Sequence, residues 1–354
     1  MMTRQAMFDW AIGAAVIVAM AIFGLYNESG PVRDGIIRFC AIGLYAMSLN
    51  VLVGYTGMLS FGHAMFFSLG AYAFCLLLQT GVVGIPSAFV LTVVIAALLS
   101  TLVGLVCVRL TRLFFAFITL AIGMLFYSTI VAWASLTGGE QGLTGGIPKD
   151  PFFGIDLGDP FHYLMVNVLL FVVSILILRR ILSSPFGAAL RMVRDNPNRC
   201  IFLGINIFRV RLTAFIIAGV YASLGGVLMA LYVSGAYPNF AYWTMSGDGL
   251  FMIMLGGVNV FLGPAVGAGI LLALETVTKT YTSHHGFVLG VVILVTAMGL
   301  KRGLLEYVLE KLGAIRGGQG GALDGKASMP AHAVEVGHEA TESVSLARTG
   351  REQE

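Results

Sequence analysis

The sequence predicts an all-α protein of the polytopic membrane class: a transmembrane helical bundle of about 8–10 spans that includes a broken or re-entrant helix. The 354-residue chain is 58% hydrophobic and 11% charged, with a mean hydropathy of +0.90. Soluble domains are about 45–50% apolar and about 25% charged. From Phe39 to Val108 there is no Asp, Glu, Lys or Arg. Because one crossing needs about 20 apolar residues, this stretch holds about three crossings.

Apolar stretches of spanning length recur along the whole chain. The candidate spans are 8–26, 36–54, 58–78, 86–108, 113–136, 161–181, 212–234, 248–278 and 286–300. Spans 36–54 and 58–78 are separated only by Tyr55-Thr56-Gly57. Either of these two is therefore a candidate for a re-entrant segment.

Basic residues in the loops predict the orientation. Loop 179–211 holds seven of the 21 Lys and Arg residues against the single acidic Asp195, so it is expected on the cytoplasmic side. Loop 137–160 is acidic and is expected outside. Arg33 and Arg38 conflict with an N-terminus inside, which would place them outside, and the sequence leaves that conflict open.

A break is predicted near the end of the apolar region. Lys301-Arg302 predicts that the tail lies inside, which requires an extra reversal in 248–278. Gly256-Gly257 and Gly263-Pro264 supply it, with 248–258 as a re-entrant half-helix and 263–278 as the outward crossing. Non-helical backbone at membrane depth must be shielded by protein or line a watery cavity, so a cavity is implied.

Motifs of known enzymes are missing. The sequence has no HExxH and no GxSxG, and its four cysteines form no CxxC pair, so neither catalytic nor metal-binding residues are predicted. Segment 320–327 resembles a phosphate-binding loop, but Ala327 replaces the Ser or Thr that would bind Mg²⁺. We therefore expect this chain to bind no cofactor and no nucleic acid. Asp248 and Glu275 fall near predicted helix ends, where solvation is the simpler interpretation.

The cytoplasmic loop has an amphipathic pattern. Leu190 and Val193 recur at helical spacing, and Asp195-Asn196-Pro197 ends one short helix and can cap another. Such a segment can dock into a groove on a soluble partner. An ordinary basic loop held at anionic headgroups remains the alternative.

Four stretches together resemble the permeases of branched-chain amino acid ABC importers, of the M-type subunit. Segment 185–206 is similar to the coupling region of that family, and 49–72 is similar to its N-terminal signature. Segment 137–145 is similar to its external TGG loop, and 255–268 to its late glycine-proline motif. The resemblance covers about 36–300.

The resemblance implies a multi-pass subunit of the bacterial inner membrane that moves branched-chain or related hydrophobic amino acids by alternating access. Its expected partners are a homologous H-type permease, two ATPase subunits that bind ATP and Mg²⁺, a periplasmic substrate-binding protein and the lipid bilayer. We expect three divisions along the chain: an N-terminal transmembrane helix and loop at 1–35, a permease domain at 36–312 with coupling loop 182–211, and a disordered cytoplasmic tail at 313–354. The disorder of the tail is expected from its composition, which is rich in Gly, Ala, Ser and Glu.

The same resemblance assigns residues to roles. Coupling to the ATPase is expected of Arg191, Arg194, Asp195, Asn196 and Gly204. The translocation path is expected to involve Gly54, Gly57, Gly62, His63, Gly70, Thr137, Gly138, Gly139, Gly142, Gly256, Gly257, Gly263 and Pro264. Two other functions stay open: a permease for urea or short-chain amides, and a carrier or channel that works without ATPases.

Overall fold

The computed structural model describes residues 30–110, 112–144 and 159–281, with single residues 286, 287, 290, 291 and 294. The chain divides into two units, and all of these residues belong to the first, Met1–Val308. The predicted span 8–26, most of 286–300, the near-match to a phosphate-binding loop and the tail 313–354 lie outside the described residues.

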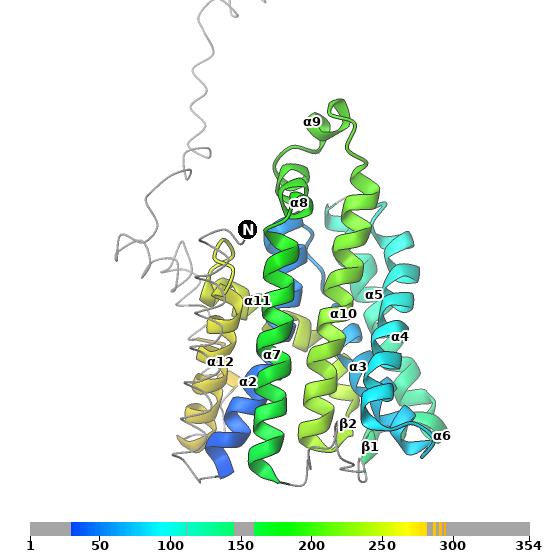
Figure 1. The fold of residues 1–354 in the computed structure, drawn as a ribbon, viewed down its shortest axis with the longest axis vertical. Coiled ribbons are helices and arrows are strands. Elements are labelled where there is room, and N and C mark those ends of the chain that lie inside the picture. The colour runs from blue at the N-terminus through cyan, green and yellow to red at the C-terminus, as the bar shows by residue number, and fades with distance from the viewer. Residues whose placement is uncertain are drawn as a thin grey trace, which may run out of the picture. The chain divides into compact units, whose positions relative to one another are not determined.

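Helices make up nearly all of the described chain (Figure 1). The long helices are α2 Gly30–Asn50, α3 Ala64–Gln79, α4 Ile85–Cys107, α5 Arg112–Ala132, α7 Pro160–Leu182, α10 Ile207–Val233, α11 Trp243–Gly256 and α12 Gly263–Tyr281. The short ones are the π-helix η1 Val51–Thr56, α6 Ala134–Thr137, η2 Gly139–Gln141, α8 Pro185–Asp195, α9 Pro197–Phe202 and η3 Pro238–Ala241. Strands β1 Leu143–Thr144 and β2 Gly235–Ala236 pair antiparallel, with Leu143 opposite Ala236.

Within the described residues, five helices are long and apolar enough to cross a membrane. They are Gly30–Thr56, Ile85–Cys107, Leu113–Ala132, Pro160–Leu182 and Ile207–Val233. The prediction of an all-α polytopic membrane protein is therefore confirmed.

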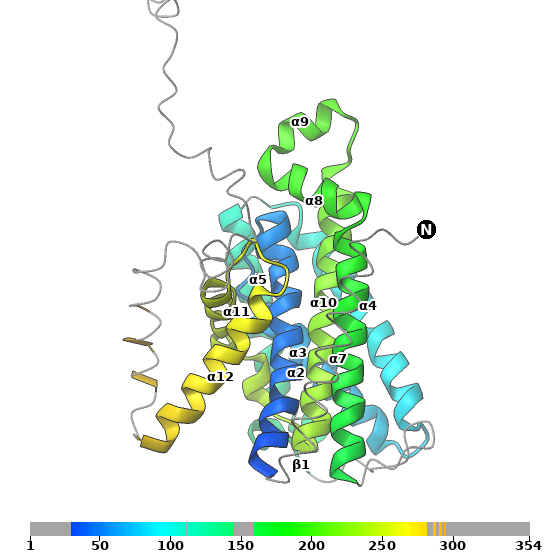
Figure 2. The same ribbon diagram turned by 60° about the vertical axis from the view of Figure 1, so that its left-hand side comes forward.

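Two of the crossing helices form the centre of the bundle. The apolar window of Gly30–Thr56 is 78% buried and that of α10 is 72% buried, against 28% for α4 and for the Leu113–Ala132 part of α5. Apolar residues of α4 and α5 such as Leu102 and Phe117 are exposed, as expected of a surface that faces lipid. Figure 2 shows α2 beside α10, and α7 also packs against α2.

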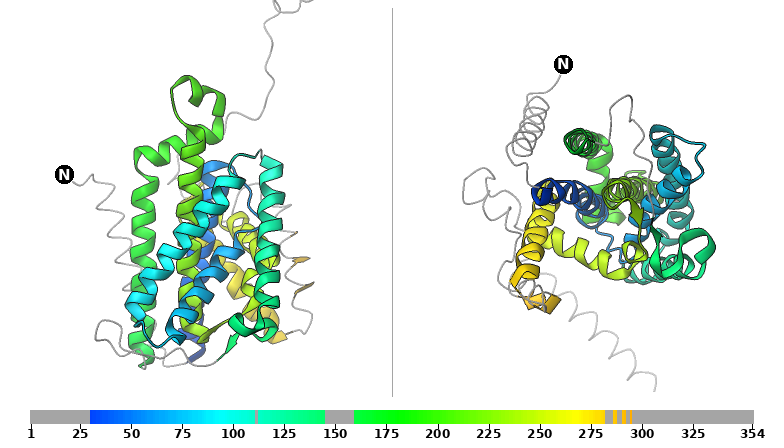
Figure 3. Two further views of the ribbon diagram at one scale, coloured as in Figure 1. Left: turned by 90° about the vertical axis from the view of Figure 1, so that its right-hand side faces the viewer. Right: turned by 90° about the horizontal axis from the view of Figure 1, so that it is seen from below.

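The bundle has two distinct ends. Helices α8 and α9 lie at one end, at the top of Figure 1, and we name this the α8 end. The paired strands and α6 lie at the opposite end, here named the strand end. Figure 3 shows the same arrangement from the side and along the bundle.

Of the two adjoining candidate spans, 36–54 and 58–78, the second is the one that is not continuous helix. Helix α2 continues as η1 to Thr56, and Gly57, with φ +70°, ends it in the left-handed region. Residues 57–63 are not regular helix, and α3 begins only at Ala64. With 16 residues α3 is about 24 Å long, shorter than a hydrocarbon core of about 30 Å. Segment 57–79 therefore combines a non-helical entry with a short helix.

The second break lies between α11 and α12. Gly257, with φ +109°, follows α11, and Pro264 stands in the first turn of α12. The two helices approach so closely that a Cβ on Gly256 would lie 1.7 Å from the Gly263 carbonyl oxygen. The predicted Gly-Gly and Gly-Pro break is present, and its first half-helix starts at Trp243, earlier than the predicted 248.

The charge conflict at the start of α2 involves an ion pair that the sequence alone did not reveal. The Arg38 guanidinium lies 3.5 Å from a carboxylate oxygen of Glu275 on α12. Lys279, one turn further along α12, also bonds Glu275. Arg38 is therefore compensated in place, so it does not act as an isolated positive charge on that side.

Replacing Gly70 with valine should destabilise the bundle. A Cβ there would lie 2.0 Å from the Ser223 carbonyl oxygen of α10, and backbone cannot move aside as a flexible side chain does. We expect a loss of about 1–3 kcal/mol, as for other overpacked cores. Thermal unfolding in detergent measures it. Gly35→Ala is the control because a Cβ on Gly35 meets nothing within 4 Å; equal melting of both variants would contradict the packing account.

Candidate functional site

Helix α8 is an amphipathic helix that lies against the end of the bundle. Its Leu190 and Val193 are buried at 0% and 1% exposure, as their helical spacing predicts. The Asn196 side chain then accepts a hydrogen bond of 3.1 Å from the Arg199 backbone N–H and caps α9. Gly204, with φ +75°, closes the turn that follows α9.

Two arginines attach α8 to η1. Arg194 donates a hydrogen bond from Nη1 to the Gly54 carbonyl oxygen, and its Cγ would lie 3.0 Å from a Cβ on Gly57. Carbonyl groups in the last turn of a helix lack partners within the helix, and a cation there is favourable. The Arg191 guanidinium lies 5.9 Å from the centre of the Tyr55 ring, in cation–π range. Asp195, 3.1 Å from the Arg194 Nε, remains on the exposed side.

The opposite side of η1 contacts the turn between α11 and α12. Asn50 donates from Nδ2 to the Val258 carbonyl oxygen at 3.4 Å. A Cβ on Gly54 would lie 3.0 Å from the same oxygen. The Arg179 guanidinium at the end of α7 lies 5.5 Å from the Phe261 ring in this turn. The π-helix therefore sits between α8 and the broken helix pair.

A buried polar chain supports the non-helical segment 57–63. His63 is 0% exposed and its Nε2 lies 2.8 Å from Ser48 Oγ. Ser48 gives its only hydroxyl hydrogen to the Tyr45 carbonyl at 2.6 Å, so His63 Nε2–H must be the donor to Ser48. The Ala64 N–H donates to Ser246 Oγ at 3.0 Å, which fixes the start of α3 to α11.

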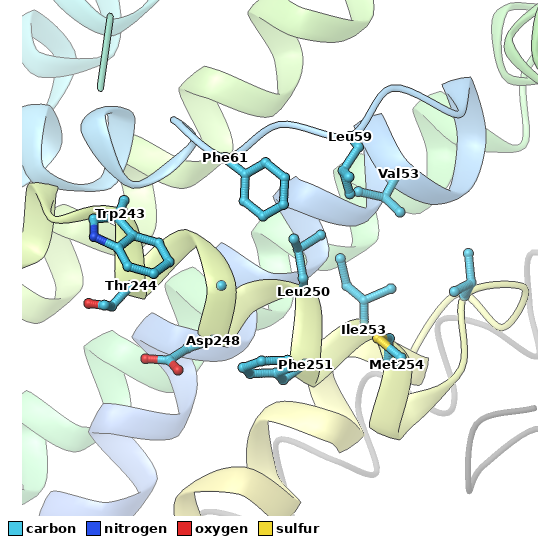
Figure 4. Close-up of a pocket in the computed structure, with 12 residues that line it drawn as sticks. Val53, Leu59, Phe61, Trp243, Thr244, Asp248, Leu250, Phe251, Ile253 and Met254 are labelled. Atoms are coloured by element: carbon cyan, nitrogen blue, oxygen red, sulfur yellow. The ribbon is translucent and has the colours of Figure 1, made fainter. Parts of the chain in front are cut away.

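A pocket of about 610 Å³ adjoins these contacts, and Figure 4 shows its side chains. It lies between α11 on one side and η1 and residues 57–63 on the other. Its lining is almost entirely apolar and consists of Val53, Leu59, Phe61, Trp243, Thr244, Gly247, Asp248, Leu250, Phe251, Ile253, Met254 and Val258.

None of the residues predicted for the translocation path lines this pocket. Gly62, Gly70, Gly256 and Gly263 sit where backbones touch, and Gly54 and Gly57 lie under α8. Thr137 and the glycines after it form a tight loop at the strand end, in which Gly138, Gly139 and Gly142 have φ of +77°, +60° and +72°. Gly257 and Pro264 flank the turn between α11 and α12. The part of all these residues in translocation stays a prediction.

Two features differ from the sequence reasoning or were missed by it. Asp248 was placed near a helix end, whereas it lies in the middle of α11, where its exposed side chain lines the pocket. An acidic residue inside an apolar helix was the signal that could have indicated it. The second feature is the apolar tip of α9: Ile201, Phe202 and Leu203 are 61%, 91% and 70% exposed. Three consecutive large apolar residues inside a basic loop were visible in the sequence.

The described residues contain no group of three His, Cys, Asp or Glu side chains placed to hold a metal ion. The described cysteines Cys40, Cys75, Cys107 and Cys200 are all buried and unpaired.

A helical bundle with two interruptions and an amphipathic helix at one end is the architecture of a polytopic membrane protein. Comparison with known proteins specifies the family. Residues 32–297 match the family described as "Branched-chain amino acid transport system / permease component", and the chain belongs to it. It is thus an ABC transporter permease of the branched-chain amino acid family.

Individual relatives agree with this family. The chain is 27% identical to the high-affinity branched-chain amino acid transport system permease protein LivM of Escherichia coli over 304 residues, 78% of this chain and 71% of the relative. The chain is also 27% identical to LivM of Salmonella typhimurium over 293 residues, which are 76% of this chain and 68% of the relative. The nucleoside ABC transporter permease protein NupC of Lactococcus lactis is 26% identical over 143 residues, 36% of this chain and 44% of the relative. No solved structure matches the chain.

Removing the Arg194 guanidinium should loosen η1. Arg194→Met keeps the stem that packs on Gly57 but loses the bond to the Gly54 carbonyl. We expect backbone amides of 51–62 to exchange hydrogen for deuterium several-fold faster, because local opening becomes easier. Arg180→Met is the matched control, since Arg180 is exposed at the end of α7. Unchanged exchange in the Arg194 variant would show that the bond does not hold η1.

Proposed function

We propose that this chain is the translocation subunit of an ATP-driven importer for branched-chain amino acids in the bacterial inner membrane. The proposal includes a second, homologous permease, two ATPase subunits that bind ATP and Mg²⁺, and a periplasmic substrate-binding protein. Its main support is the continuous set of contacts from α8 through η1 to the pocket, in a chain of this transporter family.

The mechanism follows from these contacts. The arginine-rich α8 end faces the cytoplasm, where the ATPases close on binding ATP. Their movement displaces α8 and α9, with Asn196 and Gly204 defining the hinge between the two helices and the return to α10. Arg191 and Arg194 carry the displacement to η1.

Movement of η1 reaches the pocket directly, because Val53 belongs to η1 and Leu59 and Phe61 follow it. Val258 on the other side of the pocket is bonded to Asn50. The cycle therefore alternates the access of the pocket between the two sides of the membrane. Hydrolysis of ATP remains with the partner ATPases.

The apolar tip of α9 is the surface best suited to the ATPase. Exposed large apolar side chains that lie together outside the lipid region indicate a protein interface. Phe202, at 91% exposure, is the expected anchor, since buried aromatic anchors dominate the energies of interfaces.

Phe202→Ser should therefore weaken assembly with the ATPases by at least tenfold and abolish ATP-dependent uptake. Truncation of an interface anchor costs about 2 kcal/mol or more. Copurification of the ATPases with the tagged permease measures assembly, and proteoliposome uptake measures transport. Val82→Ser is the control because Val82 is 87% exposed away from α9, beyond the end of α3. Normal assembly of the Phe202 variant would contradict the proposal that the tip of α9 binds the ATPase.

The transported compound and the need for ATP are tested in the complete reconstituted complex. We expect uptake of radiolabelled leucine that requires ATP inside the ATPase compartment and the binding protein outside. Because the chain also resembles nucleoside permeases distantly, guanosine is the second compound to test. Uptake of guanosine but not leucine would transfer the proposal to nucleosides, and uptake by the permease without ATPases would indicate an independent carrier.

A further inference from the structure

The pocket has the size of a site for a small molecule. Its volume of about 610 Å³ falls in the usual range of about 300–1,000 Å³. Most of its wall comes from one face of α11, and the opposing wall comes from Val53, Leu59 and Phe61. These walls bring hydrocarbon and aromatic groups together, which suits an apolar side chain.

Polar groups of this wall are concentrated on one side of α11. Thr244 and Asp248 are four residues apart and therefore lie on the same helix face. Figure 4 shows the Thr244 hydroxyl and the Asp248 carboxylate pointing to the same side, with Phe251 next to Asp248. Among the described residues of the lining there is no Lys, Arg or His. The pocket is therefore amphiphilic, with a negative edge beside an apolar wall.

The Asp248 carboxylate makes no hydrogen bond or ion pair with another residue in the part of the chain that the structure describes. The cations of the α2–α12 contact, Arg38 and Lys279, bond Glu275 instead. Asp248 is exposed in the isolated chain, and the other residues of the lining are mostly apolar. Within the membrane region a carboxylate in such a place is costly unless a positive group compensates it. An ionisable residue inside the membrane region is accordingly a candidate for a functional role.

We propose that this pocket is a transit site for molecules that carry an ammonium group beside an apolar side chain, and that Asp248 accepts the ammonium group. This proposal rests on the transport function proposed above. Aliphatic α-amino acids have this chemistry, whereas a nucleoside carries no ammonium group. Because the described part of the lining offers no cation for a substrate carboxylate, the site recognises the amino end of the molecule. An apolar amine without a carboxylate should then bind, and an apolar carboxylate without an amine should not.

Cysteine protection in the complete complex tests the site. Met254→Cys introduces a thiol on the pocket wall, where Met254 is 51% exposed, while the described native cysteines are buried. We expect leucine and isoamylamine to slow the labelling of this thiol by a neutral thiol reagent at least threefold, and 4-methylpentanoate to leave it unchanged. Val82→Cys is the control for effects unrelated to the pocket, and no ligand should change its labelling.

Asp248→Asn, added to Met254→Cys, removes the charge at nearly constant shape. Protection by leucine and isoamylamine should fall at least tenfold in apparent affinity, and leucine uptake should fall with it. ATP hydrolysis stimulated by the ligand-free binding protein should persist, because the coupling contacts at α8 are untouched. Asp248→Glu should retain part of the protection. Asp34→Asn, at an exposed position of α2, should behave as the wild type.

The outcomes separate this proposal from the transport function. Equal protection by the amine and the carboxylate, or protection that survives Asp248→Asn, would overturn the ammonium site. Loss of pairing between the two permeases in Asp248→Asn would also overturn it, since Asp248 would then be a contact between subunits. Protection by isoamylamine in a complex that never takes up leucine would support the site and contradict the proposed transport function.

Discussion

Backbone polar groups inside the bundle must be satisfied by protein, because hydrocarbon offers no hydrogen-bond partners. The chain leaves regular helix twice in this region, at 57–63 and at 257–262. Both segments lie against the central helix α2 and its continuation η1. Polar side chains lie beside both breaks. Ser48 accepts a hydrogen bond from His63 beside the first, and Asn50 donates to the Val258 carbonyl oxygen in the second. The rest of the arrangement depends on this shielding.

Close backbone contacts make the shielding possible. Glycines at the crossings of α3 with α10 and of α11 with α12 bring the backbones of these helices into close contact. A Cβ on Gly226 would lie 1.9 Å from the Phe67 carbonyl oxygen, and one on Gly267 would lie 1.8 Å from that of Met252. The glycines therefore act first as packing residues, and they position the pocket without lining it.

In the proposed mechanism, the breaks also connect α8 to the pocket. A straight helix transmits displacement along its axis, whereas a π-helical turn that ends at a left-handed glycine can change direction. Arg194 holds that turn on one side, and Val258 contacts it on the other. In the importer proposed above, the external binding protein selects the substrate, so one polar feature on the pocket wall is enough for the specificity asked of this chain.

Local chemistry in the sequence determined the membrane class, the break at Gly256–Pro264 and the two short helices that meet at Asn196-Pro197. Each of these follows from residues close together in the chain: apolar runs, glycine pairs, and a capping residue before a proline. Tertiary structure alone decided that Arg194 bonds a carbonyl 140 positions away, that Arg38 pairs with Glu275, and that Asp248 faces a pocket. These depend on how the helices are rotated about their axes, and with uniformly apolar helix surfaces the hydrophobic pattern does not specify that rotation.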